Sequence, residues 1–162
     1  MIRKSRVEID ELDKIDRRLL QLLQRNNLLT NLDLAERAFI SPPTCLRRIR
    51  RLRNGGIIVA DVSLLDPSRL GRNLFVYVEA VLERQDEKSQ LAFEKKMQGV
   101  DEVMECYMVS GHADFIILVQ VADMDAYHRF VRSVLTADQT IRNFRSLFAM
   151  NRSKYRTEIN LT

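Results

Sequence analysis

Five arginines lie within one seven-residue stretch of the sequence, and their chemistry suits an acidic polymer. They are Arg47, Arg48, Arg50, Arg51 and Arg53. Guanidinium groups bind phosphate oxygens through paired hydrogen bonds, and they can also read the O6 and N7 atoms of guanine in the major groove. No acidic residue interrupts the sequence between Glu36 and Asp61. The stretch therefore predicts a surface that binds a polyanion.

The net charge of the chain is concentrated in the same region. The 162 residues carry a formal net charge of +4, from 26 Lys and Arg against 22 Asp and Glu. Residues 1–65 hold 13 basic and 8 acidic side chains, whereas residues 66–162 hold 13 and 14. This asymmetry indicates that the N-terminal third of the chain meets the polyanion.

A helix is expected to present these arginines on one side. Ser41 followed by Pro42 is a strong start signal, because Ser caps free N–H groups and Pro has none to leave unpaired. Gly55 suits the end of the helix. At about 100° per residue, Arg47 and Arg51 point outward together with Thr44. The opposite side is apolar and is expected to pack inward; it consists of Cys45, Leu46, Ile49 and Leu52.

Helix-turn-helix proteins contact base edges from the N-terminal part of their second motif helix. In this sequence the corresponding residues are Ser41, Pro43, Thr44 and Arg47. Arg48 and Arg51 are better placed to contact the backbone of double-stranded DNA. A solvated basic face, or a patch for an acidic protein, is the alternative reading of an isolated arginine-rich helix.

The elements around this helix predict a winged helix-turn-helix domain over residues 1–65. Apolar residues recur at helical spacing from Leu12 to Leu23, and Asp13 is the expected N-cap. Asn31 is the expected N-cap of a second, short helix. After the arginine-rich helix, the alternation of residues 57–65 predicts one or two strands of a β-wing.

The sequence period changes after a linker at residues 66–73. Strands are predicted at 74–84, 103–110, 114–121 and 141–150, with helices over 87–99 and after Asp123. The order β-α-β-β-α-β predicts a ferredoxin-like domain over residues 74–162. The fold class is therefore α+β. Both sides of the first predicted strand are largely apolar, which predicts that a second copy covers the open face of the sheet.

Several classes of protein are not expected. Two cysteines without a CxxC spacing and two histidines predict neither a disulfide scaffold, a metal site nor a nucleophilic enzyme, and no cofactor is expected. The longest apolar runs are too short to span a bilayer, and the charged N-terminus does not predict a secretory signal. The expected compartment is a reducing cytoplasm.

Four segments of the sequence resemble the Lrp/AsnC, or feast/famine, family of transcriptional regulators. The segments are residues 12–24, 34–58, 64–71 and 105–130, in the order of the family. The resemblance implies a DNA-binding homodimer that assembles further, commonly to an octamer. It also implies regulation by an amino-acid effector, with leucine or methionine the expected ligand.

The same resemblance implies an effector site in the second domain. Its turn has the form G-x-x-D, matched by Gly111 and Asp114, in which the carboxylate would pair with an α-ammonium group. The expected effector-binding residues are Met108, Val109, Gly111, His112, Asp114, Met124, Ser146 and Leu147. The alternative for the turn is an ordinary hairpin.

Two departures from the family pattern affect the DNA-binding half. Phe39 occupies a turn position that often carries Gly, and it either changes the turn or packs as an extra core residue. The recognition helix begins S-P-P-T, from Ser41 to Thr44, rather than S-P-T-P.

Two other functions stay open: an effector-independent architectural protein that wraps DNA, and, less consistent with the few histidines, a tetrapyrrole-modifying protein.

Overall fold

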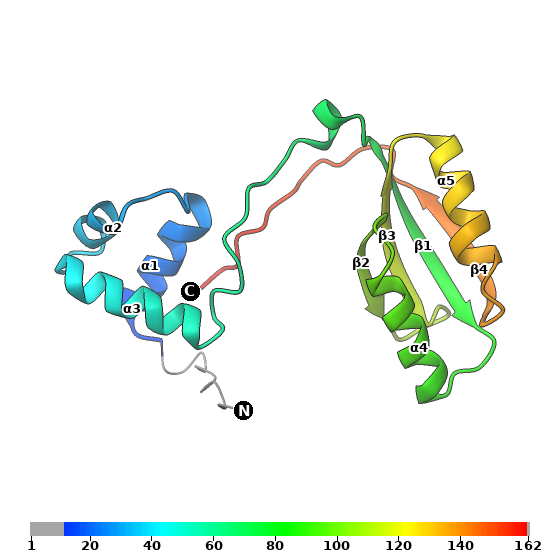
Figure 1. Ribbon diagram of the computed structural model, residues 1–162, viewed down its shortest axis with the longest axis horizontal. Helices are drawn as coiled ribbons and strands as arrows, with labels where there is room; N and C mark the ends of the chain where they lie inside the picture. The colour runs from blue at the N-terminus through cyan, green and yellow to red at the C-terminus, as the bar shows by residue number, and fades with distance from the viewer. Residues whose placement is uncertain (1–11, 162) are drawn as a thin grey trace. The chain divides into compact units, whose positions relative to one another are not determined.

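The computed structural model describes residues 12–161, which form two compact units (Figure 1). The N-terminal unit contains the described residues up to Leu64 and those from Lys154 onward, and the second unit is Leu65–Ser153. The N-terminal unit has three helices: α1 (Lys14–Arg25), α2 (Asn31–Arg37) and α3 (Pro42–Asn54).

Local sequence signals fix where the three helices begin. Asp13 caps α1 as predicted, in a reciprocal capping box with Asp16. The N-cap of α2 is Thr30 rather than Asn31, because Thr30 and Asp33 form a second capping box. Ser41 occupies the predicted cap position of α3, but its hydroxyl donates to Thr44 Oγ1 at 2.9 Å instead of capping a backbone N–H group.

The three helices share one core. Its buried members are Leu19, Leu34, Ala35, Ala38, Cys45 and Ile49. Leu52 packs nearby with Leu12 and Leu20. Leu46 departs from the prediction that it packs inward: it is 40% exposed, because it lies at the edge of the apolar arc of α3.

The prediction that residues 57–65 form one or two β-strands of a wing is wrong. Residues 57–65 form no strand, although Ile57 and Ile58 still bond to the Leu52 carbonyl and pack beside it. The rest of the segment is exposed, and no strand of the described residues pairs with it. An apolar alternation becomes a strand only where a neighbouring strand completes the ladder.

The C-terminal tail does not belong to the unit expected from the sequence, which predicts a second domain over all of residues 74–162. Its residues from Lys154 onward pack in the N-terminal unit. Arg25 pairs with Glu158 at 3.0 Å, and the Ile159 backbone exchanges hydrogen bonds with the Gln24 side chain. Leu161 joins the Leu52 cluster. These contacts are separated by more than 100 residues, so local sequence patterns carry no sign of them.

The second unit is a four-stranded antiparallel sheet with two helices, in the predicted β-α-β-β-α-β order (Figure 1). The sheet order is β2-β3-β1-β4. The strands are β1 (Leu74–Leu82), β2 (Val103–Met108), β3 (Phe115–Val121) and β4 (Ile141–Phe148). The helices are α4 (Glu87–Gln98) and α5 (Met124–Phe130), which continues as a π-helical segment, Val131–Thr136. A 3₁₀ turn at Pro67–Leu70 precedes β1.

Strand alternation divides this sheet into two faces. Alternate residues of β1 and β3, including Val78 and Ile117, pack under α4 and α5 with Phe93 and Phe130. The other face presents Tyr77, which is paired with Leu118 on one side and Leu147 on the other. Tyr77 and Leu147 are 44% and 42% exposed, so this face is partly open in a single chain.

Candidate DNA-binding surface and effector site

The start of α3 presents the side chains expected to reach base edges. Ser41, Pro43 and Arg47 are exposed, and Thr44 is half-buried. Asn31 donates to the Pro42 carbonyl at 3.0 Å and so fixes the start of α3 against the start of α2. The helix end therefore presents two hydroxyl groups, a proline ring and one arginine, which are groups that can contact base edges in the major groove.

The five arginines of α3 divide into two sets by their partners. Arg47 and Arg50 are exposed, and their side chains make no ion pair or hydrogen bond with any residue in the described range 12–161. Arg53 pairs with Asp61 at 2.9 Å. Arg48 and Arg51, both predicted to contact the DNA backbone, each bond to the Asp16 carboxylate of α1.

Asp16 receives both of these arginines. It is fully buried, and its two oxygens accept from Arg48 Nη1 at 2.9 Å and from Arg51 Nη2. Arg48 Nη1 also donates to Asp13 Oδ2 at 2.7 Å. The Asp16 backbone N–H and the Arg48 guanidinium hold the pKa of Asp13 below its usual value, and the two carboxylates raise the pKa of Arg48. We call Asp13, Asp16, Arg48 and Arg51 the α1–α3 ion cluster.

Phe39 has a backbone conformation that favours glycine and does not enter the core. Its φ is 57°, in the left-handed region that favours glycine, and its side chain is 86% exposed. The Arg18 guanidinium lies 5.5 Å from the ring centroid, and Arg18 Nε donates to the Arg37 carbonyl at 2.6 Å. The turn therefore has a left-handed residue at the position where glycine is common, and an aromatic side chain lies on its surface.

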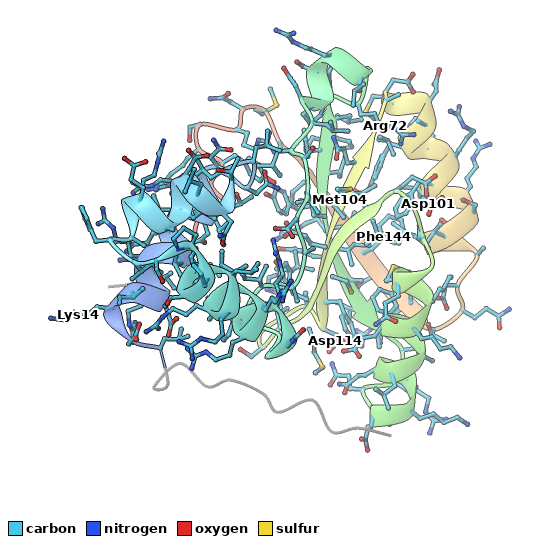
Figure 2. All side chains as sticks on the ribbon, turned by 60° about the vertical axis from the view of Figure 1, so that its left-hand side comes forward. Lys14, Arg72, Asp101, Met104, Asp114 and Phe144 are labelled. Carbon is cyan, nitrogen blue, oxygen red and sulfur yellow. The ribbon has the colours of Figure 1, made fainter. Side chains whose placement is uncertain are left out.

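The predicted effector turn is a tight connection at one end of the sheet (Figure 2, Asp114 labelled). Asp114 Oδ2 accepts from the Leu82 backbone N–H at 2.7 Å, and the Asp114 backbone bonds to Ala80 and Val109. Gly111 has a φ of 140°, and a Cβ there would meet no atom within 4 Å, so glycine is needed for conformation rather than for space. The segment connects the antiparallel strands β2 and β3 as a hairpin, which both interpretations of the turn expect.

The eight predicted effector residues fall into three groups within one chain. Five lie at or beside the turn: Met108, Val109, Gly111, His112 and Asp114. Ser146 and Leu147 are adjacent on β4 but face opposite sides, and Ser146 bonds to the Tyr127 hydroxyl under the helices at 2.5 Å. Met124 begins α5 at the far end of β3, about 20 Å from the turn at 3.3 Å per strand residue. A single chain therefore does not gather all eight.

A charged cluster beside the turn was missed from sequence. Glu79, whose side chain is 13% exposed, accepts from Arg145 at 2.7 Å and lies 3.1 Å from His112 Nε2. The contact with His112 is the main cause that holds the pKa of Glu79 below its usual value. The pairing of Glu79 with Arg145 follows from the β1–β4 register, and only a correct alignment of those strands could have revealed it.

Two hollows in the structure lie away from the predicted effector residues. One, of about 630 Å³, is in the N-terminal unit, lined by α1, residues 57–64 and the C-terminal tail. The other, of about 280 Å³, lies between α4 and β2. Among residues 12–161 no cluster of His, Cys, Asp or Glu is arranged to hold a metal ion, and no helix is long and apolar enough to cross a membrane.

Comparison with known proteins covers both units. Residues 12–59 match the family model for winged helix-turn-helix DNA-binding, and residues 75–159 match the Lrp/AsnC ligand binding domain. An uncharacterized HTH-type transcriptional regulator of Haemophilus influenzae is 40% identical over 143 residues, or 88% of this chain and 85% of that protein. The leucine-responsive regulatory protein of Escherichia coli is 34% identical over 144 residues, covering 89% and 88%.

A solved structure of similar fold contains an amino acid. A transcriptional regulator from Neisseria meningitidis, solved as a complex with L-Met, has a TM-score of 0.87 and 31% identity, covering 93% of this chain and 97% of its own. The family comprises DNA-binding regulators rather than enzymes. The helix-turn-helix unit, the βαββαβ unit and these matches together show that the chain belongs to the Lrp/AsnC family of transcriptional regulators.

Proposed function

We propose that the protein regulates transcription by binding DNA through the start of α3, with an affinity that an amino acid adjusts through the second unit. Arg47 is exposed, lies beside Ser41, Pro43 and Thr44, and has no side-chain partner among residues 12–161; this is the observation that carries the DNA-binding half. DNA phosphates supply the electrostatic attraction, and base edges supply the sequence preference. We also propose that the protein is cytoplasmic, because it must share a compartment with the DNA that it binds.

The effector is an apolar amino acid, with methionine or leucine the first candidates. Support comes from the L-Met complex of the related regulator and from the name of the E. coli relative. The Asp114 carboxylate supplies a partner for the α-ammonium group, and the N–H groups around Gly111 supply one for the α-carboxylate. Met108 and Val109 supply an apolar wall.

Assembly completes the effector site in this proposal. Met124 lies at the far end of β3 from the turn within one chain, so a pocket that uses both Met124 and the turn draws one of them from another copy. The partly open face around Tyr77 favours a dimer through the sheet, and an octamer of four dimers brings further turns together. An effector bound between copies then changes which assembly is populated, and with it how many α3 helices contact DNA at once.

A thermal-shift screen of the purified protein against the twenty amino acids, with light scattering on each hit, tests the effector half. Methionine or leucine should raise the melting temperature, because a ligand that binds only the native state stabilises it. D114N should lose that shift while keeping its fold, since the amide oxygen can still accept from the Leu82 N–H. D101N, in an exposed turn of the same unit, is the matched control.

Two results would contradict this half of the proposal. One is an unchanged ligand response in D114N, which would place the effector elsewhere. The other is a protein that binds DNA tightly but responds to none of the twenty amino acids, which would favour the architectural function instead.

For the DNA-binding half, R47A should weaken binding and leave the light-scattering mass unchanged.

A further inference from the structure

The α1–α3 ion cluster changes which arginines of α3 are available to DNA. Asp13, Asp16, Arg48 and Arg51 contribute two negative and two positive charges, so the cluster has no net charge. The pair formed by Arg53 and Asp61 is also neutral. Arg47 and Arg50, which have no partner among residues 12–161, therefore carry the net charge of this helix surface.

The geometry of Asp16 makes the cluster difficult to open. The carboxylate is fully buried at the N-terminal turn of α1, and each of its oxygens accepts from a different arginine. A phosphate that drew Arg51 away would leave a buried charge without one of its two partners, which is among the costlier changes in a protein interior. Arg48 is held at two points, because its Nη1 bonds to both carboxylates.

The cluster also joins two helices that approach from distant parts of the sequence. Asp16 lies 32 residues from Arg48 and 35 from Arg51. The two bonds lie one turn apart along α3, so they fix its rotation and its position against α1. A recognition helix must be held within a narrow range of angles to place its first residues against base edges.

We propose that Asp16 is a positioning residue for the recognition helix: it withholds Arg48 and Arg51 from DNA and leaves Arg47 and Arg50 as the arginines of this helix that are available to it. On a duplex without the preferred base sequence, Arg47 then contacts phosphate as Arg50 does. This inference rests on the proposed DNA binding by α3. It revises the sequence-based expectation that Arg48 and Arg51 contact the DNA backbone.

The salt dependence of DNA binding separates the two sets of arginines. Each phosphate contact contributes a slope of about −0.9 to a plot of log affinity against log salt concentration. Fluorescence anisotropy with a labelled 30-base-pair duplex of random sequence measures this slope without knowledge of an operator. R47A and R50A should each make the slope shallower by about 0.9 per bound helix, and R51A should change it by less than half as much.

Releasing Arg51 from the α1–α3 ion cluster should make the salt dependence steeper, whereas R47A and R50A make it shallower. D16N removes one neutralising charge and frees Arg51, so the slope should steepen by about 0.9 per bound helix. The double variant D16N/R51A should return the slope to that of the wild type. E36Q, which removes an exposed carboxylate from α2, is the matched control for a general change of charge.

The outcomes distinguish this inference from the function on which it rests. If R51A lowers the slope as much as R47A, or if folded D16N leaves it unchanged, Asp16 does not withhold the arginines. If the wild-type protein does not bind the duplex at all, the proposed function fails as well. Should D16N not fold, as far-ultraviolet circular dichroism would show, the comparison of R51A with R47A still decides the question.

Discussion

At the scale of single residues, two side chains have properties set by their surroundings: the backbone conformation of Phe39 and the thiol pKa of Cys106. Phe39 has a left-handed backbone conformation at the turn before α3, where glycine would be unstrained. Cys106 lies within β2, where burial raises the pKa of its thiol to about 11. Both properties lead to measurable expectations.

Substitution of Phe39 separates backbone strain from side-chain contact. F39A and F39G both lose the contact with Arg18, but only glycine adopts a φ of 57° without strain. F39G should therefore have a higher free energy of unfolding than F39A by about 1 kcal/mol, as measured by urea denaturation. Equal stability of the two variants would show that the turn relaxes away from this conformation.

The two thiols should be unreactive in the native protein. Cys45 is fully buried, and a Cys106 pKa of about 11 leaves about one thiolate in a thousand at pH 8. A chromogenic disulfide reagent should modify both cysteines rapidly in denaturant and neither within minutes in native buffer. Rapid modification of Cys106 in native buffer, located by peptide mass spectrometry, would contradict the raised pKa of its thiol.

At the scale of elements, local signals predict most helices and strands, whereas long-range pairings escape them. The capping residues Asp13 and Asp123 and the alternation of β1 and β3 all follow from neighbouring residues. The absence of strands in the wing and the ion cluster around Asp16 depend on partners far along the chain. The same limit applies to the proposed effector site: its turn is recognisable from sequence, but the placement of its other residues depends on the register of the sheet.

The junction between α1 and α3 should weaken in acid. The pKa of Asp13 is lower in the folded protein than its usual value near 3.8, because the Asp16 N–H and Arg48 stabilise the carboxylate. Its contribution to stability is thus fully present above the unfolded pKa and is lost as the pH falls through the folded pKa. The difference in unfolding free energy between wild type and D13N should shrink from pH 5 to pH 3. Asn retains the helix cap, so D13N isolates the charge. A difference that stays constant or grows toward pH 3 would contradict this account.

At the scale of the whole molecule, the open face of the sheet is the surface through which copies are expected to associate. Leu147 and Tyr77 are adjacent across β1 and β4, and both are about two-fifths exposed. L147D should shift the protein toward a smaller mass in light scattering, because burying an unpaired carboxylate in an apolar interface is unfavourable. L91D, on the exposed side of α4, should leave the mass unchanged. Equal effects from the two variants would place the interface elsewhere.

We propose that amino-acid binding in one unit of the protein changes DNA binding by the other. The most direct test is to measure the affinity for DNA with and without the effector. A genomic fragment selected by the protein in vitro should be titrated by fluorescence anisotropy in zero and saturating L-methionine, and then in L-leucine. The account predicts that at least one of them changes the dissociation constant by fivefold or more, which corresponds to a coupling free energy of about 1 kcal/mol. Superimposable binding curves with both amino acids, at concentrations that saturate the thermal shift, would contradict it.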